Sequence, residues 1–216
     1  MIKSYFYFHV RVRNRKEGYV MLLDLLKKRC SVRKFLEKDI PKETINYILE
    51  AGRLSPSGGN EQPWKFGVIT DKGLIKEISK LAYNQKWIET ANLLIVLCTT
   101  IVSDERGGRD IQMARFPKLK NKIKEMDKEL YSKLNQEEHQ TKIPGTHMVL
   151  AALEHGIGST WISYFKVDEL SKLLNLPKNY IPSEIIAFGY PAKEMKPVKK
   201  KSIDEILFYN KKLFKQ

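Results

Sequence analysis

Cysteine, histidine and long apolar runs are all scarce in this chain of 216 residues. The two cysteines, Cys30 and Cys98, form no C-x-x-C pair, and so small a number suits a reducing compartment. The longest strongly apolar run extends from Leu93 to Cys98, far short of the ~20 residues that span a bilayer. We therefore expect a cytoplasmic protein without a membrane span.

The four histidines do not indicate a metal centre. His139, His147 and His155 are near one another in sequence, but no cysteine or carboxylate pattern completes a ligand set around them. A protein-bound zinc ion takes three or four such ligands at characteristic spacings. We therefore expect no metal site.

Acidic residues are too few to balance the basic ones, and the formal net charge is +14. Nine of these excess charges lie in the two terminal segments, four in residues 1–20 and five in residues 193–216. Basic ends of this kind are typical of solvated tails or of a site for one bound phosphate, and no nucleic-acid-binding motif accompanies them. We expect no specific nucleic-acid partner, but a non-enzymatic basic binding protein stays as an alternative.

The length favours a single domain, and two segments differ from the rest of it. Residues 1–20 make a poor secretory signal, and we interpret them as an N-terminal extension of a domain that occupies residues 21–216. A charged helical insertion is predicted at about residues 101–144, where both signs of charge are dense. Within it, the apolar spacing of Leu119, Ile123, Met126, Leu130 and Leu134 predicts one long amphipathic helix.

The other segments alternate between helix and strand periodicity. With few hairpin signals between them, helices must cover the sheet, so the sequence predicts an α+β fold with a mixed sheet flanked by helices. One of the helices is expected to begin at Pro144 and to end before Gly156, which suits the C′ position. Strands are expected at 64–70, 93–100, 158–163 and 184–188, and further helices at 21–29, 42–54, 72–81 and 168–174.

Arg29, Ser31 and Arg33 stand at alternate positions directly after the first helix. In an extended segment such residues project to one side, so two cations would flank a hydroxyl. Cations and hydrogen-bond donors are what a phosphate group requires. A solvated helix end is the competing interpretation of these three residues.

A more specific run is Ser55-Pro56-Ser57-Gly58-Gly59-Asn60-Glu61-Gln62-Pro63-Trp64. Its two glycines permit a close backbone approach or positive φ. The amides of Asn60 and Gln62 offer both donors and acceptors, as a flat polar ring requires. A plain surface loop would not need Trp64 directly after it.

Three weaker signals complete the pattern. Asn84-Gln85 precedes the strand at 93–100, a glycine-flanked strand contains Trp161-Ile162-Ser163, and Lys199-Lys200-Lys201 follows the last predicted strand. Taken alone, these are also explained by an exposed loop, a buried strand and a solvated tail.

In their order along the chain, these motifs resemble the signature of the nitroreductase family, whose members hold FMN in the interface of a homodimer. The resemblance implies that Arg29 and Ser31 contact the FMN phosphate, Arg33 the pyrimidine end of the flavin, and the 55–64 run the ring of the partner subunit's FMN. It also implies that a backbone N–H near Ser163 or Tyr164 donates to flavin N5, and that one lysine of 199–201, preferably Lys200, neutralises the phosphate. The implied cofactor-binding residues are Arg29, Ser31, Arg33, Pro56, Ser57, Gly58, Asn60, Gln62, Asn84, Gln85, Trp161, Ile162, Ser163, Lys199 and Lys200.

The activity that this resemblance implies is that of an FMN-dependent NAD(P)H oxidoreductase. Hydride would pass from NAD(P)H through the flavin to an oxidised small molecule such as a nitroaromatic compound or a quinone, with no catalytic side chain. Residues 116–134 are predicted to cover the open flavin face. An FMN-binding relative with flavin-storing, flavin-modifying or dehalogenating activity is the alternative within the same family.

Overall fold

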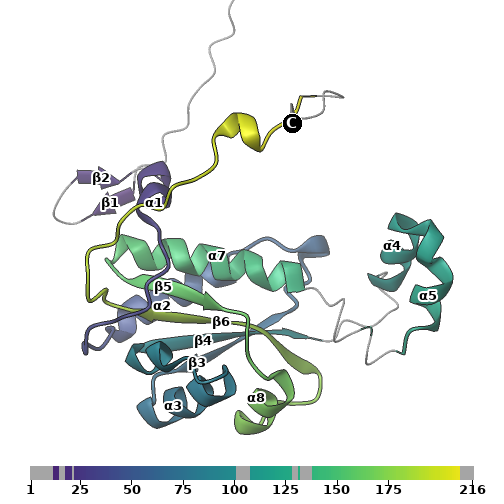
Figure 1. Ribbon diagram of the computed structural model, residues 1–216, viewed down its shortest axis with the longest axis horizontal. Coiled ribbons are helices and arrows are strands. Elements are labelled where there is room, and N and C mark those ends of the chain that lie inside the picture. The colour runs from purple at the N-terminus through teal and green to yellow at the C-terminus, as the bar shows by residue number, and fades with distance from the viewer. Residues whose placement is uncertain are drawn as a thin grey trace, which may run out of the picture.

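The computed structural model describes residues 12–14, 18–20, 22–100, 108–127, 131 and 138–209. Its centre is a four-stranded sheet with helices on both faces (Figure 1). The strand order is β3-β4-β6-β5 and each neighbouring pair is antiparallel. The strands are β3 (Trp64–Ile69), β4 (Leu93–Thr100), β5 (Gly158–Ile162) and β6 (Tyr180–Gly189), and a small separate pair is formed by β1 (Val12–Asn14) and β2 (Gly18–Val20).

The two middle strands are buried because both of their faces carry apolar side chains. Leu93 to Cys98 are all at most 2% exposed, which explains why β4 has no alternation of apolar and polar residues. Alternate residues of the neighbouring β6 face opposite sides of the sheet, so Ile185 and Ile186 join different core clusters.

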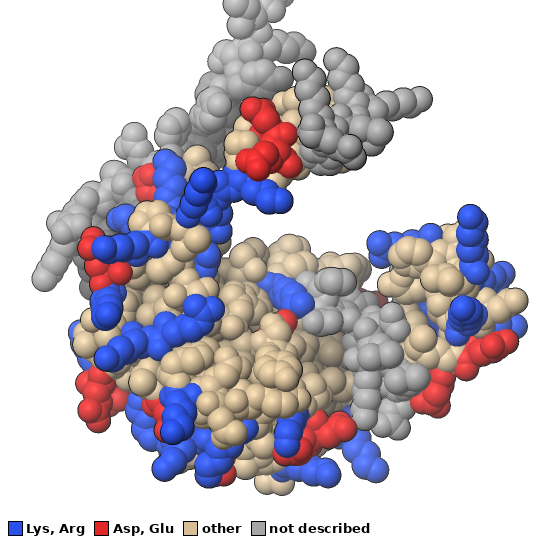
Figure 2. All heavy atoms as spheres, viewed as in Figure 1, with Lys and Arg blue, Asp and Glu red and all other residues tan. Residues whose placement is uncertain are grey.

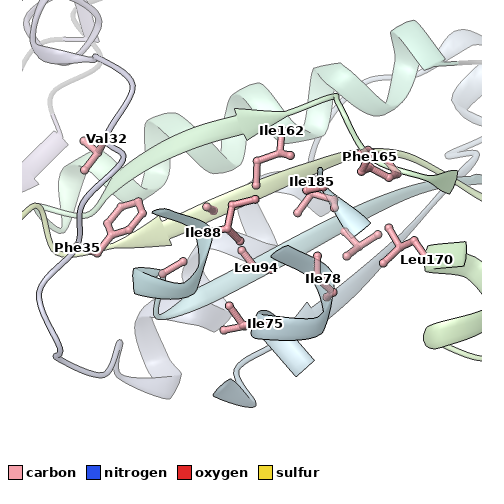
Figure 3. Packing of buried hydrophobic residues seen from close by; sticks show 14 of the residues in the cluster. Val32, Phe35, Ile75, Ile78, Ile88, Leu94, Ile162, Phe165, Leu170 and Ile185 are labelled. Atoms are coloured by element: carbon pink, nitrogen blue, oxygen red, sulfur yellow. The ribbon is translucent and has the colours of Figure 1, made fainter. Parts of the chain in front are cut away.

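One core layer contains α2 (Lys42–Arg53) and α7 (Glu138–Glu154), and the other contains α3 (Lys72–Leu81), η2 (Lys86–Thr90) and α8 (Val167–Leu173). Figure 3 shows the second layer, where Ile75, Ile78 and Ile88 point toward Leu94 and Ile185. The predicted helices at 42–54, 72–81 and 168–174 and all four predicted strands are present, although β6 begins four residues earlier than expected.

The expected start of a helix at Pro144 is wrong, because α7 begins at Glu138 and contains Pro144 in its interior. Proline disfavours a helix interior because it lacks a backbone N–H. Here Pro144 is buried, and tertiary packing of α7 against the sheet outweighs the local preference. The predicted end is confirmed: Gly156 has φ +70° and its N–H donates to Leu153 O at 3.0 Å.

The insertion does not form one long helix. It contains α4 (Gly108–Arg115), η4 (Pro117–Leu119) and α5 (Lys120–Glu125), and the backbone leaves helical geometry at Met126 with ψ 130°. Pro117 interrupts the first helix, and the Arg109 guanidinium of α4 donates to the carbonyls of Lys124 and Met126 at the end of α5. The chain therefore folds back on itself. Leu130 and Leu134, which the prediction included, lie outside the described residues.

The two ends of the domain lie beside each other, away from the sheet. The expected first helix is α1 (Leu22–Lys28), and a C-terminal arm, residues 192–209, runs past it (Figure 1). Among the described residues, no helix combines the length and the apolar character that a membrane crossing requires.

Candidate functional site

Residues 31–36 pass the outer edge of β5 near its start and then lie beside residues 190–192, which follow β6. Ser31 and Ser159 form a parallel bridge, and the N–H of Val32 donates to Ser159 O at 3.0 Å. The Val32 and Phe35 side chains point into the core (Figure 3). Ser31 and Arg33 are consequently turned outward and exposed, which is the alternation expected of an extended segment.

Gly158 permits this close approach. A Cβ atom at Gly158 would lie 2.6 Å from Val32 Cγ2 and 3.0 Å from Pro191 Cγ, closer than such atoms pack. The C-terminal arm also begins beside the arginine-serine segment, because Ala192 N donates to Lys34 O at 3.0 Å. The arginine-serine segment is thus fixed between β5 and the arm.

The charge on this edge is not neutralised within the described part of the chain. Arg29 is half-buried and Arg33 exposed, and neither forms an ion pair with a described carboxylate. Lys199 and Lys200 are exposed on the arm. Figure 2 shows Lys and Arg side chains gathered over α1 and the start of the arm. An anion such as a phosphate group fits this edge.

The far end of β5 meets the loop after α3. Gln85 Nε2 donates to Ala82 O at 3.0 Å and to Tyr164 O at 3.4 Å, and the Tyr83 and Tyr164 rings stack with centroids 3.9 Å apart. The structure therefore brings together two predicted elements, residues 84–85 and 161–163. Asn84 is exposed with φ +58°, whereas the Gln85 amide is already engaged within the protein.

The three predicted residues of β5 and its end have different surroundings. Ile162 is 2% exposed in the core, so its side chain faces no ligand. Trp161 is half-buried against α7 at Gly145. Ser163 is exposed, and its Oγ donates to Glu184 Oε2 at 2.6 Å. What this strand end offers to a ligand is its backbone and Ser163.

The loop of residues 55–63 is held in a specific shape. Ser57 Oγ accepts from Gln62 N and Gln140 Oε1 accepts from Gly58 N, both at 2.9 Å. Asn60 and Gln62 have φ +55° and +49°, a region in which residues other than glycine are strained, and such strain clusters at binding sites. The Gln62 side-chain amide donates to Asn60 Oδ1 at 3.2 Å, and both residues are exposed.

This loop leads into β3, whereas the arginine-serine segment follows β5, so they belong to opposite edges of the four-stranded sheet. Three strand spacings alone amount to roughly 14 Å. The sheet of one chain thus separates the two predicted halves of a site.

Three supporting residues were not found from the sequence. Besides Gln140, His147 Nδ1 lies 2.7 Å from Ser55 Oγ at the start of the loop, and Glu184 contacts Ser163. No motif marks the α7 residues, since their partners are 82 and 92 positions away. For Glu184 a signal existed, because it is a carboxylate at the start of the predicted apolar strand at 184–188 and inside β6. A recess of about 470 Å³ between α2 and β3 adjoins the loop at Gln62.

Known proteins share both sequence and fold with this chain. The Nitroreductase family model matches residues 26–190. A putative NADH dehydrogenase/NAD(P)H nitroreductase of Archaeoglobus fulgidus is 28% identical over 176 residues, covering 80% of this chain and 86% of that protein. An iodotyrosine deiodinase of Thermotoga neapolitana is also 28% identical, over 177 residues, covering 79% and 89%.

A solved structure agrees with the fold. An FMN-dependent nitroreductase of Clostridium difficile R20291 superposes with a TM-score of 0.67 at 23% identity, covering 87% of this chain and 99% of that one. This likeness confirms the predicted α+β fold class. Because the family model covers most of the chain, from α1 to the end of β6, the protein belongs to the nitroreductase family of oxidoreductases.

Proposed function

We propose that the protein is an FMN-dependent NAD(P)H oxidoreductase in which each site is built from both chains of a homodimer. The observation that carries the proposal is that two elements suited to bind a ligand lie at opposite edges of the sheet. One element is the cationic segment at Arg29, Ser31 and Arg33, and the other is the strained amide loop at Asn60 and Gln62. A phosphate-bearing polar ring system is the ligand that suits both.

The chemistry of these residues fits FMN. Arg29, Ser31 and one lysine of the arm, Lys199 or Lys200, would bind the phosphate, because cations and donors favour a dianion. Ser159, which lies beside Ser31, and Ser163 are four positions apart along β5 and its end, which is roughly 13 Å of extended chain. A ribityl chain joins a phosphate to a ring over a comparable reach. The ring would then lie at Ser163 and Tyr164.

When bound, FMN would supply the redox chemistry, which is hydride transfer from NAD(P)H to an oxidised acceptor. The chain's own residues bind and orient. Arg33 would hold the pyrimidine edge, Asn60 and Gln62 of the partner chain would offer amides to the ring, and the backbone at Ser163 and Tyr164 would donate to it. No side chain needs to act as a nucleophile.

Exposed apolar side chains support a homodimer. On α1, Leu22 and Leu23 are 55% and 66% exposed, and on the arm Ile203 and Phe208 are 64% and 63% exposed. Apolar residues gathered in this way mark interaction surfaces. We expect an obligate interface that buries at least about 2,000 Å².

The test is the absorption spectrum of the purified protein, followed by NADH and NADPH oxidation with nitroaromatic and quinone acceptors. The proposal expects a flavin band near ~450 nm that bleaches anaerobically with NAD(P)H. A colourless protein that takes up no FMN and binds DNA with a steep salt dependence would instead indicate a basic binding protein.

A second candidate function within the family is reductive dehalogenation, which the similarity to the iodotyrosine deiodinase favours. The same residues around the flavin would serve dehalogenation. Halide release from a halogenated phenol, measured beside nitro and quinone reduction, distinguishes the two. Faster turnover of the halogenated compound would replace the reductase assignment while leaving the flavin site unchanged.

A further inference from the structure

A carboxylate is buried directly behind the strand end at Ser163. Glu184 belongs to β6, an inner strand between β4 and β5, and its side chain is 2% exposed. Burial of an isolated charge is costly, so a buried carboxylate requires partners. Glu184 has two: Lys142 Nζ lies 3.2 Å from Oε1, and Ser163 Oγ donates to Oε2 at 2.6 Å.

These three residues connect three elements. Glu184 shares the α7-facing side of β6 with Ile186 and Phe188, whose side chains pack in the cluster beneath α7. Lys142 comes from α7, which lies over β5 and β6 (Figure 1). Ser163 is the first residue after β5. The charge is therefore held between the helix and the strand end that is proposed to contact the ring.

The exposure of the ion pair is unequal. The Lys142 side chain is 40% exposed, whereas Glu184 is almost fully enclosed. Solvent screens the lysine more effectively than the carboxylate, so the pair presents a net negative field to its protein surroundings. A hydrogen bond from the exposed Ser163 to that carboxylate also fixes the direction of the hydroxyl group.

We infer that Glu184 is a positioning residue that lowers the reduction potential of the flavin by holding an oriented hydroxyl and a buried negative charge behind Ser163. The inference rests on the proposed FMN site. Reduction adds electrons to the ring, and a nearby negative charge opposes this. Lys142 opposes the effect of Glu184 and limits it.

Opposite shifts are the signature of this arrangement. Glu184→Gln removes the charge and leaves Lys142 in place, so the bound flavin should be easier to reduce. Lys142→Gln leaves the carboxylate uncompensated, so the flavin should be harder to reduce. A unit charge about 10 Å away at an effective dielectric constant of about 20 changes the reduced-to-oxidised ratio on the order of tenfold. A loss of packing alone would not shift the reduced-to-oxidised ratio in opposite directions in the two variants.

The experiment is an anaerobic equilibration of each FMN-loaded variant with a reference dye, read from the flavin and dye absorption bands. Ser163→Ala, which keeps both charges, tests the hydroxyl separately and should shift the ratio less than Glu184→Gln. Thermal unfolding of the FMN-free variants checks that they fold. If Glu184→Gln does not fold, Lys142→Gln alone decides the sign of the charge effect, since it should make the flavin harder to reduce.

The matched control is the pair Lys166 and Glu169, which forms a similar ion pair at 3.0 Å close to the same strand end but is 47% and 49% exposed. Solvent screens exposed pairs, so Glu169→Gln should leave the ratio unchanged. Unchanged ratios in Glu184→Gln and Lys142→Gln, or shifts of the same sign, would overturn the inference while the flavin site stands. A wild-type protein that binds no FMN would overturn both.

Discussion

At the scale of single residues, burial gives the two cysteines different reactivity. Desolvation raises the pKa of Cys98 to about 12, and the residue is 2% exposed in β4. Cys30 is half-buried between Arg29 and Ser31. Because thiol reagents react with the thiolate, only Cys30 should be modified in the folded protein at pH 8.

A thiol titration with a chromogenic disulfide reagent checks this. We expect no fast-reacting thiol in folded Cys30→Ser protein and one thiol after denaturation. Rapid modification of folded Cys30→Ser would mean that β4 is not the buried strand described above.

The arginine-serine segment gives the second prediction at this scale. Arg29→Ala combined with Ser31→Ala should weaken FMN binding by a factor of at least roughly 100, since each charge-assisted contact contributes about 1.5–3 kcal/mol. The dimer should stay folded, because both side chains are outside the core. Fluorescence titration of FMN-free protein measures the affinity. Lys34→Ala, an exposed neighbouring cation, is the control, and undiminished flavin in the double variant would remove the phosphate assignment.

The outward orientation of Ser31 and Arg33 was predictable because their pattern is local. The alternation of Ser31, Val32 and Arg33 follows from extended geometry alone. A local pattern could not place Glu184 against Ser163 or Gln140 against Gly58, since these contacts join residues 21 and 82 positions apart. Such partners are set by how the elements pack.

At the scale of elements, α7 shows how packing overrides local preference. Gly145 faces the sheet, and a Cβ there would lie 2.4 Å from Trp161 Cη2 and 2.7 Å from Leu97 Cδ1. Gly145→Ala should therefore lower the free energy of unfolding by about 1–3 kcal/mol, although alanine favours a helix.

Chemical denaturation of both Gly145→Ala and Gly73→Ala measures the effect. In the control, the added Cβ lies 3.2 Å from the Asp71 carboxylate on the surface of α3, and the change should stay below about 1 kcal/mol. Equal effects in the two variants would show that α7 does not pack closely on the sheet.

The strands and the helices at 42–54, 72–81 and 168–174 were predictable because each carries a local signal, which is an unbroken apolar run in β4 and a periodicity in the helices. The insertion was not. Its apolar spacing suited one helix, but Pro117 and the contacts of Arg109 with the end of α5 divide it. A pattern of spacing does not reveal where a side chain from another helix binds the backbone.

The insertion also gives a prediction about acceptors. Phe116 and Leu119 are each 47% exposed, and we propose that residues 116–134 cover the open flavin face. Replacing this segment by a short glycine-serine linker should change the relative kcat/KM values of large and small acceptors while FMN stays bound. An unchanged acceptor profile would leave the segment without this role.

At the scale of the whole molecule, the central claim is that one site requires two chains. Two variants divide that site: Arg29→Ala with Ser31→Ala removes the phosphate contacts, and Asn60→Ala with Gln62→Ala removes the amide loop. Each homodimer should bind little flavin, because both of its sites lack one half.

The decisive measurement is the flavin content of a heterodimer of these two variants, co-expressed with different affinity tags and purified through both. If sites are shared, one site combines both mutated halves and the other combines both intact halves, so the heterodimer should hold one FMN per two chains. If every site belonged to one chain, both sites would be damaged, and a heterodimer without flavin would contradict the account.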